Sequence, residues 1–230
     1  MVLSDRLGAA ADMVGTGAHL ADVGTDHGFV PISLVLRSRI PSAIAMDVKE
    51  GPLQRARAHI REAGLEAFIQ TRLSDGLEAL LPGEADSVLI AGMGGALTVR
   101  ILQKNPPEDL GIRELILQPQ SELGKVRKHL CCSGWRIDRE DMVLEDGKYY
   151  PMMHCRPGEM TLTDIEEEYG PLLIREHHPV LLKYLQFQEE VLERNLDQMR
   201  DAESERACIR RQEIEASLRR VRELHAQLRA

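Results

Sequence analysis

The segment His19–Gly28 reads HLADVGTDHG and sets two acids around a glycine. An aliphatic run ends at Val23 and Gly24 interrupts it, which is typical of a strand that turns into a helix. Asp22 and Asp26 place two carboxylates at this turn. Ligands of α/β sheets bind beyond the carboxyl ends of the strands, so we expect both acids to face a ligand.

The turn is unsuited to a phosphate ligand. The phosphate-binding pattern G-x-G-x-x-G is absent, because Thr25, Asp26 and His27 follow Gly24. Two carboxylates near a helix start would repel a pyrophosphate, whereas they would attract a cation. S-adenosylmethionine, with its sulfonium and ammonium groups, is a ligand of this kind. The alternative for Asp26 is a purely structural role as the helix N-cap.

Polar residues also follow the later aliphatic runs. Asp47 ends AIAMD, where a carboxylate can accept hydrogen bonds from ribose hydroxyls. Asp75 follows in LSDG and can accept a hydrogen bond from an adenine amine, with an Asx turn as the alternative. The fourth run enters IAGMGG, where Gly92 allows close approach of a ligand unless the glycines serve only the turn. The fifth run ends at Gln118 and Pro119.

The elements that position these residues alternate between short aliphatic runs and helical segments, the pattern of βαβ units and a parallel sheet. The predicted strands are His19–Val23, Ala43–Met46, Ile69–Leu73, Ser87–Ala91 and Glu114–Leu117. The predicted helices are Gly51–Ala63, Gly95–Gln103 and Leu123–Cys132. Two later runs, Trp135–Leu144 and Tyr149–Cys155, flank a hairpin signal at Asp146–Gly147. By analogy, this layout is an α/β Rossmann-like class I methyltransferase sheet, with parallel strands plus an antiparallel hairpin.

The C-terminal part has a different character. The proline-marked stretch 157–179 is predicted to be a linker with one short helix at Thr163–Tyr169. Beyond it, the heptads Leu185–Leu192–Met199 and Ile214–Val221–Leu228 predict an antiparallel, coiled-coil-like helical hairpin that turns near Asp201–Glu205. We therefore predict two domains, 1–157 and 158–230.

Composition excludes several classes of protein. The formal net charge of −8 disfavours non-specific binding to nucleic acid, so any such partner must meet a local basic patch. The cysteines lack the spacing of a disulfide framework or a zinc site, and we expect no metal. The N-terminus lacks signal-peptide features and no run is long enough to span a membrane, so we expect a cytoplasmic protein without membrane contact.

Six motifs, in order, resemble those of the bacterial tRNA (adenine-22-N1)-methyltransferase family over essentially the whole chain: DVGTDHG, AIAMDVKEGP, SDGL, IAGMGG, LILQPQ and EDGKYY. The resemblance implies S-adenosylmethionine-dependent methylation of adenine N1 at position 22, in the D-arm of tRNA. It implies a cofactor pocket formed by Asp22, Gly24, Asp26, His27, Asp47, Val48, Asp75, Gly76, Gly92 and Met93. It places Gln118 and Pro119 beside the target base.

The chemistry of adenine narrows the roles of these residues. N1 carries an in-plane lone pair and can attack an activated methyl group directly, once the base is unpaired or extruded. Gln118 has a donor and an acceptor on one amide and could read the N6/N1 edge. Asp26 is the candidate to stabilise the positive charge of the methylated base or, with His27, to help remove a proton from N6.

Contacts with tRNA are expected from tail arginines together with Arg6, Lys125, Arg127 and Lys128, and a solvated, salt-bridged tail surface is the alternative. Three other functions remain open. A methyltransferase could act on another RNA base, and a non-catalytic adaptor could bind S-adenosylmethionine and recruit a partner through the tail. An NAD-dependent oxidoreductase would need the missing glycine-rich turn. We expect a monomer.

Overall fold

The structure is a computed structural model that describes residues 3–199 and 204–229. The chain forms two compact units, Met1–Leu172 and Leu173–Ala230, which are described separately below. None of the described helices is both long enough and apolar enough to cross a membrane.

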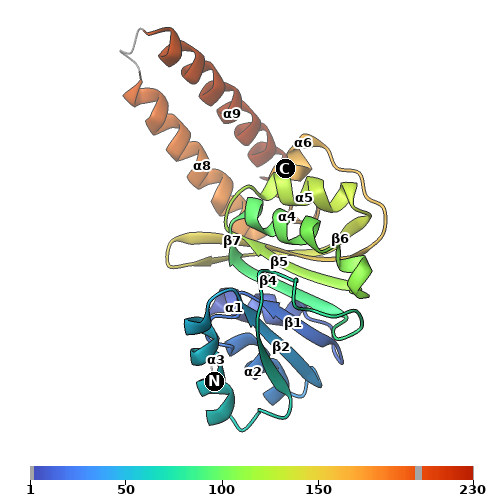
Figure 1. Ribbon diagram of the computed structural model, residues 1–230. Coiled ribbons are helices and arrows are strands. Elements are labelled where there is room, and N and C mark those ends of the chain that lie inside the picture. The colour runs from blue at the N-terminus through green and yellow to red at the C-terminus, as the bar shows by residue number, and fades with distance from the viewer. Residues whose placement is uncertain (1–2, 200–203, 230) are drawn as a thin grey trace. The chain divides into compact units, whose positions relative to one another are not determined.

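A seven-stranded sheet with the order β3-β2-β1-β4-β5-β7-β6 forms the centre of the first unit (Figure 1). Its parallel strands are β1 (His19–Val23), β2 (Ser42–Asp47), β3 (Ile69–Leu73), β4 (Ser87–Met93) and β5 (Glu114–Pro119). An antiparallel hairpin of β6 (Trp135–Glu145) and β7 (Lys148–Pro157) completes the sheet, because β7 pairs with β5. The predicted Rossmann-like methyltransferase sheet with its hairpin is confirmed.

Helices cover both faces of this sheet. The first unit contains α1 (Asp5–Met13), α2 (Phe29–Leu36), α3 (Glu50–Glu62), α4 (Gly95–Lys104), the 3-10 helix η1 (Pro107–Leu110), α5 (Leu123–Cys132) and α6 (Asp164–Tyr169). Buried residues of α1, α2 and α3 pack with Leu89 and Ile116, whereas those of α4 and α5 pack with Ile90 and Leu117. This alternation follows from the period of two along a strand, and it sorts the side chains of β4 and β5 between two cores.

Helix α1 was not predicted from the sequence. Its sequence DRLGAAADM buries only Ala10, Ala11 and Met13, so it lacks the wide apolar stripe that marks an amphipathic helix. It is held instead by packing against the sheet. This helix brings Arg6 and Leu7 to the candidate site described below.

Strands β4 and β5 continue past their predicted ends, to Met93 and Pro119, across an irregularity between Ala91 and Met93. Gly92 lies inside this bulge with φ +77°, a conformation that glycine adopts without strain. The glycine therefore bends the strand without ending it.

Residues 158–172, which the sequence analysis assigned to the second domain, belong to the first unit. The side chain of Arg127 on α5 holds this segment against the first unit by hydrogen bonds to its backbone. Its Nη1 donates to the backbone carbonyls of Glu167 and Glu168 at 2.9 and 3.0 Å, and its Nε donates to Glu140 at 3.0 Å. Arg127 is fully buried, so the expectation that it contacts tRNA is wrong. The spacing of residues along α5 does not reveal the partners that make such burial possible.

Replacing Arg127 with alanine is expected to lower the free energy of unfolding by about 3–5 kcal/mol, because the guanidinium is removed from the buried Glu140 carboxylate. Urea denaturation of the two proteins measures the difference. The control is Lys128→Ala on the same helix, an exposed position where a change within about 0.5 kcal/mol is expected. Equal stability of Arg127→Ala and the unmodified chain would contradict the structural role of this ion pair.

The second unit is a helical hairpin of α8 (Pro179–Gln198) and α9 (Glu205–Arg229), preceded by α7 (Pro171–Arg175), which begins in the first unit. Glu189 pairs with His225 and Glu193 with Arg222, so the two helices run antiparallel. Their shared interior contains Leu181, Leu185, Ile214, Leu218, Val221, Leu224 and Leu228. The two predicted helices are present, and the predicted turn near Asp201–Glu205 lies largely outside the described residues.

Candidate active site

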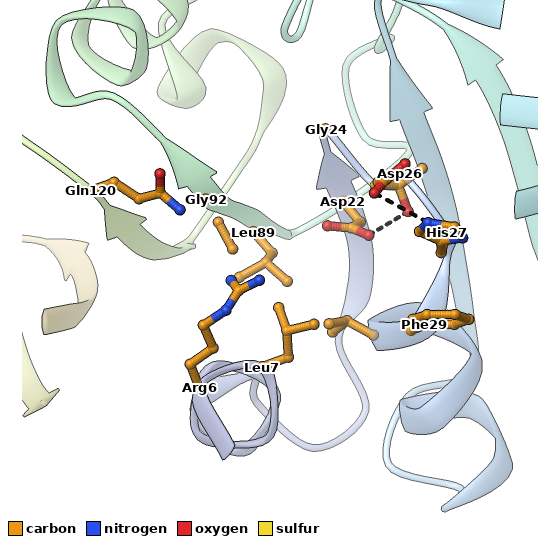
Figure 2. A pocket seen from close by; sticks show the side chains of 13 residues that line it. Arg6, Leu7, Asp22, Gly24, Asp26, His27, Phe29, Leu89, Gly92 and Gln120 are labelled. Carbon is orange, nitrogen blue, oxygen red and sulfur yellow. Dashed lines mark hydrogen bonds and ion pairs between the residues drawn. The ribbon is translucent and has the colours of Figure 1, made fainter. Parts of the chain in front are cut away.

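A cavity of about 250 Å³ opens at the carboxyl ends of β1 and β4, on the face of the sheet that α1 covers (Figure 2). The turn between β1 and α2 forms one wall, and the end of β4 forms another. The remaining lining comes from α1, from Phe29 and Val30 at the start of α2, and from Gln120 after β5. The described residues include no cluster of His, Cys, Asp and Glu that could hold a metal ion.

Asp22 is the buried acid of this cavity, with 5 % of its surface exposed. Burial raises the pKa of Asp22 to about 6, the hydroxyl of Thr25 opposes that rise, and the nearby Asp47 adds to it. Thr25 Oγ1 donates to the Asp22 carboxylate at 2.5 Å. A carboxylate that is costly to ionise in the free protein would gain much from a cationic ligand.

The turn after β1 is fixed by backbone bonds and by close packing. The amides of Gly24 and Thr25 donate to the carbonyl of Met46 at 2.8 and 2.9 Å, which anchors the turn to the end of β2. Gly24 has φ +76°, and a Cβ at this position would collide with Cε of Met93. Gly24 therefore allows both the turn and the approach of Met93 from β4.

Asp26 lies at the cavity with φ +49°, and its carboxylate contacts Arg55 and His27. The N-cap of α2 is Gly28, so the alternative role of Asp26 as a helix cap is excluded. The His27 ring stacks on Phe29 at a centroid distance of 5.0 Å (Figure 2). The result is an exposed acid beside a short aromatic stack, at the mouth of the cavity.

Asp47 and Asp75 lie along the same edge of the sheet, at the ends of β2 and β3, outside the cavity lining. The Asp47 carboxylate accepts a hydrogen bond from the Lys49 amide at 2.9 Å. Asp75 is exposed and pairs with Lys104 at 3.1 Å. The Ser74 hydroxyl closes the turn after β3 by donating to the Gly76 carbonyl, so an Asx turn at Asp75 is not what shapes it.

Arg6 reaches the cavity from α1. Its Nε pairs with Glu145 at 3.3 Å, and its guanidinium lies 5.2 Å from the centre of the Tyr150 ring, so it also joins α1 to the β6–β7 hairpin. Arg6 and Asp22 line the same cavity and bring opposite charges to it. This combination suits a zwitterion such as an amino acid, with its ammonium toward Asp22 and its carboxylate toward Arg6.

Comparison with known proteins identifies the family. The methyltransferase domain family matches residues 3–153. The tRNA (adenine(22)-N(1))-methyltransferase of Bacillus subtilis is 35% identical over 192 residues, which cover 79% of each chain. The chain belongs to the tRNA (adenine(22)-N(1))-methyltransferase family.

Solved structures agree with this membership. A Streptococcus pneumoniae protein, provisionally named a tRNA (m1A22) methyltransferase and solved in complex with S-adenosyl-L-methionine, has a TM-score of 0.88 and 35% identity over 97% of this chain and 100% of its own. TrmK of M. capricolum, solved with S-adenosyl-homocysteine, has a TM-score of 0.85 and 25% identity over 98% of this chain and 99% of its own.

Within this member of the family, the predicted site residues fall into three groups. The cavity is lined by Asp22, Gly24, Asp26, His27 and Gly92, and Met93 packs against Gly24. Asp47, Val48, Asp75 and Gly76 lie along the adjoining edge, at or just after the ends of β2 and β3, where Val48 is 59% exposed. Gln118 and Pro119 are buried at the end of β5 and do not line the cavity.

Sequence reasoning missed several lining residues. Leu7, Phe29 and Gln120 were not predicted, and Arg6 was assigned to tRNA. Leu89 and Ala91 could have been predicted from the period of two along β4. Leu89 is in register with Asp22, so the side chains of Leu89 and Ala91 lie on the same face of the sheet as Asp22. No local signal places α1 over the sheet.

Proposed function

We propose that this chain methylates N1 of adenine 22 in tRNA, with S-adenosylmethionine as the methyl donor. The observation that carries the proposal is the cavity with a buried carboxylate and a guanidinium, in a chain that shares its family with the B. subtilis enzyme of that name. The bound cofactor supplies an electrophilic methyl group, and the protein supplies alignment and a dry site.

The residues present fit this cofactor. The raised pKa of buried Asp22 supports its role as the partner of the ammonium group, and Arg6 would hold the carboxylate of the methionine end. Asp47 and Val48 would hold the ribose and adenine side, and Asp75 with Gly76 would face the adenine amine. Gly24 and Gly92 leave room for close approach of the ligand.

The base side of the site needs no group to deprotonate N1 before attack. Asp26 would stabilise the positive charge that methylation places on the base, or with His27 would help to remove a proton from N6. The contact of Asp26 with Arg55 keeps this carboxylate at the rim of the cavity. Gln118 and Pro119, behind the end of β4, would stand next to the base.

Replacing Asp47 with alanine is expected to raise the dissociation constant for S-adenosylmethionine roughly 10- to 100-fold, because hydrogen bonds to a charged acceptor are lost. Calorimetric titration measures the affinity. The matched control is Asp86→Ala, since Asp86 precedes β4 at the opposite edge of the sheet, where its carboxylate accepts a hydrogen bond from the His19 amide at 2.7 Å. The assignment of Asp47 is wrong if both variants keep the native affinity.

Tail arginines are proposed to contact the tRNA backbone. Arg219 and Arg220 on α9 are exposed and form no ion pair with any residue in the described ranges. Changing both to glutamine is expected to leave cofactor affinity unchanged and to reduce the slope of log KM for tRNA against log salt by roughly 1–2, since each arginine neutralises one phosphate. An unchanged slope would assign these arginines to a solvated surface.

We propose, as the sequence analysis expects, that the chain acts as a cytoplasmic monomer. Light scattering of the free protein tests the monomer. The function itself is tested by incubation with methyl-labelled cofactor and unmodified tRNA, followed by mapping of the labelled nucleoside. A label on 1-methyladenosine at position 22 is expected. Cofactor binding with no labelled tRNA would favour the adaptor function.

A further inference from the structure

The amide of Gln118 has one satisfied end and one unsatisfied end. Its side chain is fully buried, and Oε1 accepts from the Gly92 amide at 3.1 Å and from Arg6 Nη1 at 3.5 Å. Its Nε2 is buried and makes no hydrogen bond with any residue of the described ranges. Native structures rarely leave a buried donor in this state, and a ligand is one of the explanations.

The orientation of this amide is fixed by its neighbours. Exchanging Oε1 and Nε2 would set the NH₂ group against two donors, the Gly92 N–H and the Arg6 guanidinium. Since both lone pairs of Oε1 already have donors, Gln118 can offer only N–H to a ligand. It therefore cannot accept a hydrogen bond from the N6 amine of adenine, as the sequence had suggested.

The side chain of Gln118 lies on the cavity's side of the sheet. Gln118 is in register with Ala91, and the side chains of parallel register partners project to the same face. Ala91 lines the cavity, as do both groups that hold the amide, Arg6 and Gly92. The unsatisfied NH₂ therefore lies just behind the wall formed by α1 and the end of β4.

We propose that Gln118 selects the target adenine by donating a hydrogen bond from Nε2 to a ring nitrogen other than N1. This inference rests on the proposed function. N1 must keep its lone pair for the methyl group, so a donor there would block the reaction. The acceptors that remain on adenine are N3 and N7, and the role of Gln118 is recognition of one of them.

Gln118→Glu is the sharpest variant for this proposal. It keeps an oxygen toward Gly92 and Arg6, and it replaces the donating NH₂ with a second oxygen. We expect kcat/KM for tRNA to fall roughly 10- to 100-fold. The rate is measured at saturating S-adenosylmethionine and below the melting temperature of the variant, because a buried carboxyl beside Arg6 changes both stability and the side chain that faces the cofactor. Full activity on tRNA under these conditions would overturn the proposal.

The unmodified enzyme provides a second, independent test with two tRNAs, in which adenine 22 is replaced by 3-deaza- or 7-deazaadenine. The analogue that lacks the acceptor should lose activity roughly 10- to 100-fold with the native enzyme, and the other should not. The Gln118→Glu variant should methylate that same analogue and native tRNA at equal rates. This comparison controls for a change in the reactivity of the base itself. Equal rates on native tRNA and both analogues overturn the proposal, whereas failure on native tRNA overturns the proposed function instead.

Discussion

Asp22→Asn should bind S-adenosylmethionine about 100-fold more weakly than the unmodified chain, yet it should unfold at a higher temperature at pH 7.5. Asp22 is the buried acid of the cavity, and removing one partner of a buried charge pair costs about 2–5 kcal/mol of binding. Asparagine has nearly the same shape and can still accept the Thr25 hydrogen bond. Calorimetric titration and thermal denaturation measure the two effects.

The gain in stability follows from the direction of the pKa shift. Burial raises the pKa of Asp22 from 3.8 to about 6, so the folded chain binds the proton more tightly than the unfolded chain. The ionised acid therefore destabilises the fold by about 3 kcal/mol above pH 6, and this cost disappears as the pH falls toward 3.8. In Asp22→Asn the cost is absent at every pH.

Cofactor affinity should depend on pH through the same group. The ionised form of Asp22 binds the ammonium group, so the affinity of the unmodified chain should fall up to tenfold for each pH unit below about 6. The affinity of Asp22→Asn should lack this dependence. Asp47→Asn is the matched control, because it should lose affinity while gaining less stability than Asp22→Asn, since Asp47 is the smallest of the three influences on the pKa of Asp22. An Asp22→Asn enzyme with native affinity at pH 7.5 would remove Asp22 from the cofactor site.

A tRNA in which adenosine 22 is replaced by guanosine should not be methylated. Guanine N1 carries a hydrogen and has no free in-plane lone pair, so it cannot attack the methyl group as adenine N1 does. With native tRNA, the methyl group blocks Watson–Crick pairing, and reverse transcriptase should stop at position 22. Primer extension, together with mass analysis of the nucleosides, measures both results.

The control for this substitution is a second tRNA that keeps adenosine 22 and has a guanosine introduced at another position of the D-arm. This tRNA should remain a substrate as long as the tRNA fold is kept. Methylated guanosine from the substituted tRNA, or N6-methyladenosine from the native one, would contradict the N1 assignment. Either result would leave the methyltransferase activity in place. The position of the methyl group and the methyltransferase activity are thus tested separately.

Local sequence was enough for the sheet and for the order of its acids. Short aliphatic runs that end in Asp or Gly and alternate with helical segments predicted the five parallel strands, and Asp146–Gly147 predicted the hairpin. Asp22, Asp47 and Asp75 each sit at or just after a strand end, and parallel strands bring their carboxyl ends to one edge. Hence their common location follows from chain order and the right-handed crossover alone.

Only the tertiary structure decided which side chains meet at the cavity. Arg6 comes from a helix whose apolar pattern is weak. Gln118 cannot accept a hydrogen bond from the N6 amine, because its side-chain oxygen already accepts hydrogen bonds from Gly92 and Arg6. Arg127 looks like a surface cation in sequence, yet Glu140 and two backbone carbonyls make its burial possible. In each case the deciding partner is distant in sequence, and hydrogen-bond satisfaction in the folded interior leaves no periodic signal in the chain.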